Sequence, residues 1–235
     1  LINQKRNISR KLGPSSEIKI DSEGATLISG KLSDPVKAFG NLMEGLQNRF
    51  SKTQRYTTIR RGASRKRLTA RKITLSQEFP DIVWENIGPG YSYRLIIGEK
   101  SIDISQREGD VVRYTVSGLK PGIHPFGVEV RKDDQTVFEA SMGKLTWLTN
   151  EKMARLQEGI RVLQTAVPGD DFLLAGLLEE HGLMVPAMDH YQKHFSNYPE
   201  DNDMRPMLVQ AYGKLRLEKL RQLEAKRYFK NLDEE

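Results

Sequence analysis

Residues 171–202 read DFLLAGLLEEHGLMVPAMDHYQKHFSNYPEDN, and this stretch decides the fold of the C-terminal part of the chain. Large apolar, small and aromatic residues follow one another here as a pair of antiparallel helices requires, because small side chains let two helices approach closely. A proline then stands where it prevents the second helix from continuing. The stretch therefore predicts a two-helix unit, and the positions that carry the pattern are Leu174, Leu178, Gly182, Ala187, Tyr191 and Pro199.

This order of residues resembles a tetratricopeptide repeat. A repeat of that family cannot bury its apolar face alone, so it stacks on neighbouring helices and presents a concave binding face. We expect such neighbours in a helix that begins near Asn150, a helix after Asp203 and a last helix over residues 217–231. Arg221 stands where a second repeat would need a small residue, as in an atypical terminal repeat. The resemblance implies a protein that holds other proteins.

Composition and charge exclude several classes of protein. The chain has 37% hydrophobic and 29% charged residues, as globular proteins do, and it has no cysteine for disulfides, thiol catalysis or cysteine-bound zinc. No apolar run approaches the ~20 residues of a membrane span. Residues 1–72 carry 17 Lys/Arg against 5 Asp/Glu, a net +12, and residues 73–235 carry 20 against 26, a net −6, which together give the formal +6. This split predicts modules with different surfaces.

Short strand patterns follow one another closely from Lys72 to about Thr149. Turn signals such as Gly88-Pro89-Gly90 separate them, and this spacing predicts an antiparallel β-sandwich. We expect strands at residues 72–75, 81–84, 91–97, 101–104, 111–116, 127–131 and 136–148, the last with a break near Gly143.

The motifs of this region are Val83-Trp84, Tyr93-Arg94-Leu95, Leu119-Lys120-Pro121-Gly122 and Val128-Glu129-Val130. They resemble those of a fibronectin type III or related immunoglobulin-like sandwich. The resemblance implies that Trp84 lies in the core and touches Tyr93 or Val128. Pro125-Phe126 stands where that family has a tyrosine, so we do not expect the hydrogen bond of a tyrosine corner.

The N-terminal part mixes strands with a helix. Alternating polar and apolar residues predict strands at 17–20 and 25–29, and Ser33-Asp34-Pro35 predicts a helix start. An apolar stripe over residues 36–50 follows. Its polar side is not rich in Lys or Arg, so we expect the stripe to pack on its own sheet rather than on a membrane surface.

Three N-terminal motifs carry a further resemblance: LGPSSEI at 12–18, LISGKL at 27–32 and YTTIRRG at 56–62. They are similar to the latter half of a FecR-type envelope domain, with Ala63 in place of the threonine of that family. The first half of the domain has no counterpart in this sequence. The resemblance implies a periplasmic or cell-surface setting.

A basic run covers residues 55–72 and contains a short strand pattern at 57–59. Such a run is most often a solvated surface or linker; the alternatives are contact with an acidic protein, an anionic envelope polymer or a membrane surface. Tyr56 is the one aromatic residue beside it, which is a poor platform for stacking bases, so a nucleic-acid partner is not expected. The candidate contact residues are Arg60, Arg61, Arg65 and Arg67.

No catalytic signature reaches the strength of the repeat pattern. His190 and His194 lie four residues apart on one helix face, a spacing that can chelate a metal, and His181 is near. No glutamate follows His190 as in a zinc protease, so we expect His194 to serve packing and His190 to be solvated. Phosphate-loop and serine-hydrolase motifs are absent from the sequence, and its paired acids sit where Asp caps helices or forms turns. We predict no enzyme activity, no metal and no cofactor.

These observations predict a multidomain β-plus-α protein. A basic FecR-like segment covers residues 1–71, an immunoglobulin/fibronectin-III-like β-sandwich covers 72–149 and a TPR-like helical domain covers 150–235. The predicted function is that of a non-enzymatic interaction or scaffold protein of a bacterial cell envelope, which binds protein partners through the helices. The alternative is a FecR-type regulatory protein that relays an envelope signal across the membrane. Further candidate partner contacts are His181, His190, Met207 and Tyr212.

Overall fold

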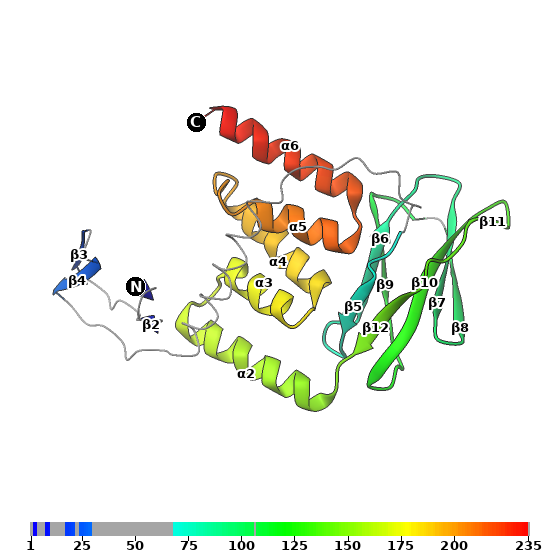
Figure 1. The fold of residues 1–235 in the computed structure, drawn as a ribbon, viewed down its shortest axis with the longest axis horizontal. Helices are drawn as coiled ribbons and strands as arrows, with labels where there is room; N and C mark the ends of the chain where they lie inside the picture. The colour runs from blue at the N-terminus through cyan, green and yellow to red at the C-terminus, as the bar shows by residue number, and fades with distance from the viewer. Residues whose placement is uncertain are drawn as a thin grey trace.

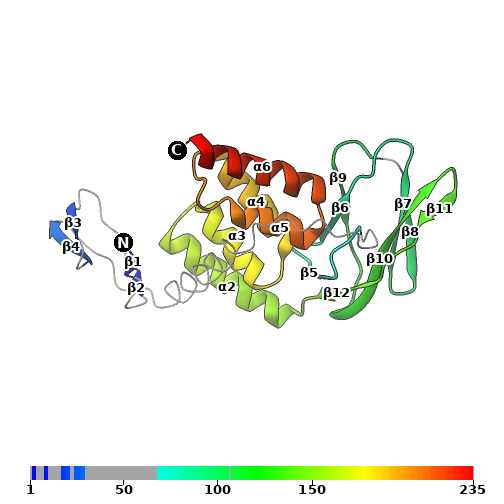
Figure 2. The ribbon, with the colours of Figure 1, turned by 45° about the horizontal axis from the view of Figure 1, so that its top comes forward.

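The computed structural model of the chain describes residues 2–3, 8–9, 17–21, 24–29, 68–105 and 107–234. Near the N-terminus, β1 (Ile2–Asn3) pairs with β2 (Ile8–Ser9), and β3 (Glu17–Asp21) pairs with β4 (Gly24–Ser29), both in antiparallel. The second pair confirms the strands expected there. A β-sandwich and a helical domain follow (Figure 1, Figure 2).

Several N-terminal predictions fall outside the described residues. These are the helix over residues 36–50, the strand at 57–59 and the arginines of the basic run, Arg60, Arg61, Arg65 and Arg67. Within the described ranges, no helix combines the length and the apolar character that a bilayer crossing requires.

Two sheets build the sandwich, as predicted. The larger sheet has the order β5 (Lys72–Leu75), β12 (Gly143–Trp147), β10 (Gly122–Lys132), β7 (Ser92–Ile97) and β8 (Lys100–Ile104). The short strand β11 (Gln135–Phe138) pairs with the end of β10. The smaller sheet consists of β6 (Asp81–Glu85) and β9 (Val111–Thr115). All pairs are antiparallel except β5 with β12, which is parallel.

Trp84 occupies the centre of the sandwich. Its side chain is fully buried, and its ring meets Tyr93 edge to face with 5.7 Å between the ring centroids, which confirms the predicted contact. The Tyr93 hydroxyl donates to Asn86 Oδ1 and accepts from the Ile87 amide, both at 2.8 Å. Burial raises the pKa of this phenol. Phe126, in place of the family tyrosine, is packed in the core without a hydroxyl.

Five helices follow the sandwich: α2 (Asn150–Ala166), α3 (Asp171–Glu180), α4 (Met184–Asn197), α5 (Pro206–Leu215) and α6 (Glu218–Glu234). They lie where the sequence predicts helices, and α6 matches the predicted 217–231 to within a few residues at each end. Thr149 caps α2 through its side-chain oxygen. Gly182, with φ of 76°, makes the left-handed turn between α3 and α4.

The sandwich and the helices share one hydrophobic core. On β6, Ile82 and Trp84 face the larger sheet, so Val83 between them faces the opposite way. Val83 is nevertheless buried, because α4 packs against β6. Figure 1 shows the helices beside the sandwich, with β5 and β6 nearest to them and β8 and β11 on the far side. The outer face of the smaller sheet is therefore an interface with the helical domain.

Candidate interaction surfaces of the helical domain

The predicted repeat positions bring α3 and α4 together. Leu178, Ala187 and Tyr191 have no exposed surface, and Leu174 is partly buried against the core. A Cβ on the turn glycine, Gly182, would lie 2.8 Å from Thr74 Oγ1 of β5, so this turn sits directly against the sandwich. Pro199 follows the end of α4 and is exposed. The packing agrees with the predicted two-helix unit.

A buried carboxylate ties α3 to the next two helices. Glu179 accepts a hydrogen bond of 2.8 Å from the Tyr191 hydroxyl of α4 and one of 2.5 Å from Lys214 Nζ of α5. The Glu179 side chain is almost fully buried, and Lys214 is half-exposed. Because a buried charge is stabilised only when it is paired, these contacts fix the relative position of three helices.

The histidines are engaged by separate carboxylates. His190 Nδ1 lies 2.8 Å from Asp171 Oδ1, and His194 Nε2 lies 2.8 Å from Asp201 Oδ2. His194 also contacts the rings of Phe172, Phe195 and Tyr198, with centroids 5.0–5.1 Å away, so it serves packing as expected. The solvation expected for His190 is wrong, because its ring is half-buried beside Asp171.

The third candidate histidine, His181, does not join His190 and His194 in a metal site. His181 is exposed at the C-terminal end of α3. Among the residues that the structure describes, no three His, Asp or Glu side chains gather in a way that could hold a metal ion. The histidines are therefore part of the α3–α4 packing and its edge rather than of one site.

The protonation of the Asp171 carboxyl should change the free energy of unfolding of this protein. Burial acts to raise the pKa of its carboxyl, but hydrogen bonds from His190 and Lys193 outweigh burial and lower this pKa. A lowered folded-state pKa stabilises the fold above the ordinary pKa of ~3.9, and that stabilisation is lost as the pH falls through the folded value.

We expect Asp171→Asn to lower the free energy of unfolding by about 1–2 kcal/mol at pH 7, the scale of a charge-assisted hydrogen bond. The difference from wild type should shrink below about pH 4. Urea unfolding followed by circular dichroism at pH 7 and pH 3 measures both values. Glu200→Gln, in the exposed α4–α5 loop, is the control and should change neither. A difference that is equal at both pH values would contradict the assigned role of Asp171.

Charged side chains bridge the sandwich and the helices. Arg113 of β9 donates to Asp81 at 3.0 Å and to Asp189 of α4 at 2.6 Å, and the hydrogen bond to Asp189 is the main cause of a raised pKa of this guanidinium. At the start of α6, the Lys219 amide donates to Glu85 at 3.0 Å and its Nζ to the Asn86 carbonyl at 2.9 Å. These contacts orient α4 and α6 on the smaller sheet.

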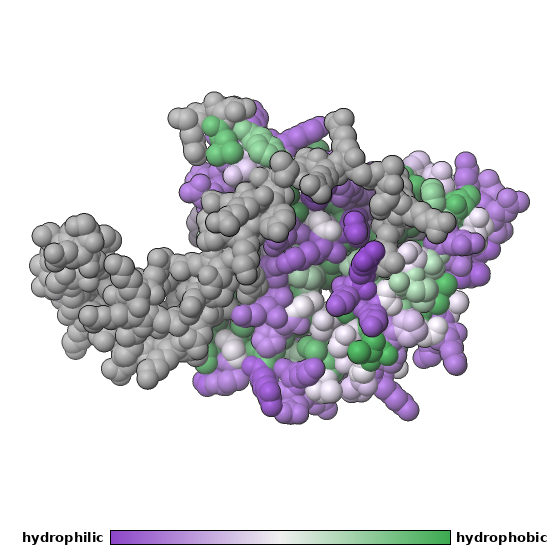
Figure 3. Space-filling model, in the orientation of Figure 1, coloured by the Kyte–Doolittle hydropathy of each residue, from purple (hydrophilic) through white to green (hydrophobic). Residues whose placement is uncertain are grey.

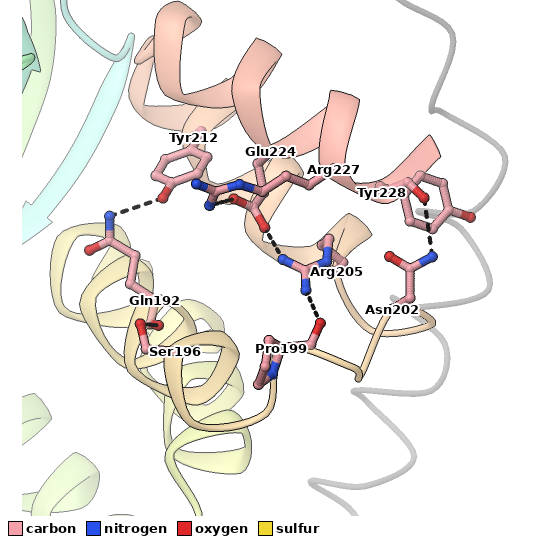
Figure 4. A network of polar contacts seen from close by, with 9 residues as sticks. All are labelled: Gln192, Ser196, Pro199, Asn202, Arg205, Tyr212, Glu224, Arg227 and Tyr228. Atoms are coloured by element: carbon pink, nitrogen blue, oxygen red, sulfur yellow. Dashed lines mark hydrogen bonds and ion pairs between the residues drawn. The ribbon is translucent and has the colours of Figure 1, made fainter. Parts of the chain in front are cut away.

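A buried ion pair holds the last two helices together. Arg205, which precedes α5, pairs with Glu224 of α6, and both side chains are only 5% exposed. Arg205 also donates a hydrogen bond of 2.5 Å to the Pro199 carbonyl oxygen, and its guanidinium lies 5.0 Å from the ring centre of Phe195. Figure 4 shows Arg205 between Pro199 and Glu224, with Arg227 on the other side of the carboxylate.

Two of the predicted partner contacts belong to the core instead. Met207 is 1% exposed and Tyr212 is 4% exposed, because the short helix α5 is enclosed by α4 and α6. The Tyr212 hydroxyl accepts a hydrogen bond from Gln192 at 2.9 Å, and burial raises the pKa of this phenol. Their apolar spacing marks a packed helix, so as exposed contact residues these two predictions are wrong.

The exposed apolar surface of the helical domain lies at its last hairpin instead. Leu223 is 51% exposed and Phe229 is 43% exposed, and Leu232 of the same helix is also exposed. Figure 3 shows hydrophobic surface over the C-terminal part of α6, at the upper left of the molecule. The sequence did not lead us to predict these residues as partner contacts. Their signal was present in α6 as apolar residues on more sides of the helix than one packing face can bury.

Two comparisons with family models cover most of the described chain. Residues 68–148 match the immunoglobulin-like domain of magnetotaxis protein MtxA, and residues 150–230 match the C-terminal domain of the same protein. No curated protein matches the chain. The first match covers the sandwich and the second covers α2 to α6, apart from the end of α6. The chain is thus similar to magnetotaxis protein MtxA over two adjoining domains, an immunoglobulin-like domain and a helical C-terminal domain.

Proposed function

We propose that this chain is a non-enzymatic, protein-binding component of magnetotaxis, and that its helical domain holds the partner. The similarity to two domains of a magnetotaxis protein supports the process. The exposed apolar side chains of the last helical hairpin support the binding role, because large apolar side chains left in solvent are candidates for contact with a partner. Three of the eight large hydrophobic residues that are exposed in the described part lie there: Leu223, Phe229 and Leu232.

The surroundings of this hairpin hold it in a fixed position, which favours recognition of a partner. The buried Arg205–Glu224 pair and the Glu179 contacts hold α3 to α6 in fixed positions. The bridges from Arg113 and Lys219 join the helices to the sandwich. A surface held in this way loses little conformational entropy when a partner binds, which favours affinity.

Three finer proposals rest on the sequence alone. We place the protein in the periplasm or at the cell surface because of the FecR-like motifs. We assign the basic run, with Arg60, Arg61, Arg65 and Arg67, to an anionic envelope polymer or membrane surface, as the charge excess of the N-terminal part suggests. A FecR-type relay of an envelope signal is the alternative function. Fractionation of cells that carry the tagged full-length protein tests the location on which all three depend.

The test of the binding role is complementation of a deletion strain. We expect wild-type protein to restore magnetotactic swimming and the Leu223→Ala/Phe229→Ala variant to fail at equal protein level, because the apolar anchors of the partner contact are lost. Val137→Ala/Phe138→Ala removes exposed apolar side chains from β11 of the sandwich and serves as the matched control. Full restoration by the α6 variant would refute binding through this hairpin.

A further inference from the structure

We propose that Met142 is a reversible oxidation site, at which a peroxide converts the thioether to a sulfoxide and thereby loosens one edge of the sandwich. Met142 belongs to the segment between β11 and β12, residues 139–142, which we call the crossing segment. The inference goes beyond the proposed function, because it concerns the surroundings of β11, on the side of the sandwich away from the helices (Figure 1).

The crossing segment fills the place of a missing side chain on the larger sheet. On β10, Phe126 and Val128 face the core, so Gly127 between them faces outward. A Cβ on Gly127 would lie 2.9 Å from Met142 Sδ and 3.0 Å from Ala140 Cβ. Gly127 is buried although it faces outward. The thioether of Met142 therefore covers the backbone of β10 at this glycine.

The crossing segment also connects two separate ladders of β10. The ladder with β12 ends at Phe126 opposite Gly143, and the ladder with β11 begins at Val130 opposite Phe138. A Cβ on Gly143 would lie 2.8 Å from the Phe126 ring and from the Arg71 carbonyl oxygen, so the chain is closely packed where it enters β12. All four residues of β11 are exposed, and β11 pairs only with β10 among the described strands. So short a ribbon has little stability of its own, and its position depends on the packing of the crossing segment.

Met142 is the methionine that an oxidant can reach. Among the six methionines in the described part of the chain it alone is exposed, with 44% of its surface in solvent. Met204 is half-buried, and the others are at most 8% exposed: Met153, Met184, Met188 and Met207. Because a peroxide must reach the sulfur atom, exposure decides which methionine reacts first.

The reaction is a two-electron oxidation of the sulfur atom. A sulfur lone pair attacks one oxygen of hydrogen peroxide and the O–O bond breaks. The attacked oxygen stays on the sulfur, and the second oxygen leaves with both hydrogens as water. Enzymes of the methionine sulfoxide reductase class reverse this step, so the site can return to its starting state.

Oxidation changes what the side chain can pack against. A sulfoxide is polar, so holding it in the apolar contact with Gly127 and Ala140 costs free energy that the thioether does not. The oxidised side chain should therefore turn toward solvent and uncover β10 at Gly127. We expect β11 to detach as a result, while the core around Trp84 stays packed.

The experiment treats the full chain with dilute hydrogen peroxide and locates the added oxygen by peptide mass spectrometry. We expect Met142 to react at least about tenfold faster than any buried methionine. Hydrogen–deuterium exchange of the oxidised protein should be at least about tenfold faster in β11 and in the facing end of β10, and unchanged in β7 and in α3 to α6. Methionine sulfoxide reductases for both sulfoxide epimers should restore the slow exchange.

Matched variants separate the sulfoxide from other effects. Met142→Leu keeps an apolar side chain of similar volume without an oxidisable sulfur, so peroxide should leave its exchange unchanged. Gly127→Ala places a Cβ against the Met142 sulfur and should give the fast exchange without peroxide. Met142→Gln makes the side chain polar and replaces Gly127→Ala if that variant does not fold. Met204→Leu is the control and should respond to peroxide as wild type does.

Three results would overturn the proposal. These are faster oxidation of another described methionine, unchanged exchange after complete oxidation of Met142, and faster exchange throughout the chain in place of a local change. The swimming test of Leu223→Ala/Phe229→Ala does not involve Met142. The oxidation site and the proposed binding role can therefore fail independently of each other.

Discussion

Replacing Trp84 by alanine is expected to lower the free energy of unfolding by about 3–5 kcal/mol. The indole is fully buried between the two sheets, against Tyr93, and its strand β6 also supports α4. The cavity would therefore open in the core that sandwich and helices share. Urea unfolding of the full chain, followed by far-UV circular dichroism, measures the loss. The expected loss is a large part of the ~5–15 kcal/mol by which a domain is stable. A loss below about 1 kcal/mol would be typical of an exposed side chain and would contradict the central position of Trp84.

Two further variants separate the cavity from other effects. The Trp84 Nε1 group has no hydrogen-bond partner among the described residues, so Trp84→Phe removes volume without breaking a polar contact. We expect it to lose about 1–2 kcal/mol. Ile123→Ala truncates an apolar side chain of β10 that is 68% exposed, and it should stay within ~0.5 kcal/mol of wild type.

The order of elements could be predicted because local patterns and tertiary packing agree over most of residues 72–234. The helix α3 begins at Asp171, where the predicted two-helix unit starts, since Asp170 caps its first turn and Gly182 provides the turn after it. The strand β10 is longer than predicted. It begins at Gly122 and continues through Pro125, and proline is a poor signal for a strand inside a sheet.

The shared core was harder to predict from sequence. Ile82, Val83 and Trp84 are three consecutive buried residues, which indicates a strand covered on both faces, but so short a run does not say what covers the second face. That cover comes from α4, more than 100 residues later in the chain. Contacts between charged residues so far apart, such as Arg113 with Asp189, leave no local signal.

The candidate surface was misplaced for a related reason. Apolar spacing predicted that Met207 and Tyr212 lie on helices, but it could not tell which helix is enclosed and which is outermost. α5 is enclosed because α4 and α6 both pack on it. Leu223 and Phe229 are exposed because the described helices end their stack at α6. The position of a helix in the stack, rather than its own periodicity, decides whether its apolar side chains are available to a partner.

Breaking the buried Arg205–Glu224 pair should have an effect as large as that of the Trp84 cavity. We expect Arg205→Met to lower the free energy of unfolding by about 3–5 kcal/mol, because the Glu224 carboxylate stays buried with only the outlying Arg227 as a counter-charge. The variant also loses the hydrogen bond to the Pro199 carbonyl and the contact with the Phe195 ring. Urea unfolding at pH 7 measures the change.

A double-mutant cycle isolates the pair from those additional contacts. Glu224→Leu alone leaves the Arg205 guanidinium buried without its carboxylate, whereas Arg205→Met/Glu224→Leu removes both charges and fills the space with apolar atoms. The double variant should therefore be more stable than either single variant, because burying two charges costs desolvation that an apolar pair avoids. Arg227→Ala, on the exposed side of the carboxylate, should cost at most ~1 kcal/mol. Additive losses in the cycle would show that Arg205 stabilises the hairpin through Pro199 and Phe195, and not through Glu224.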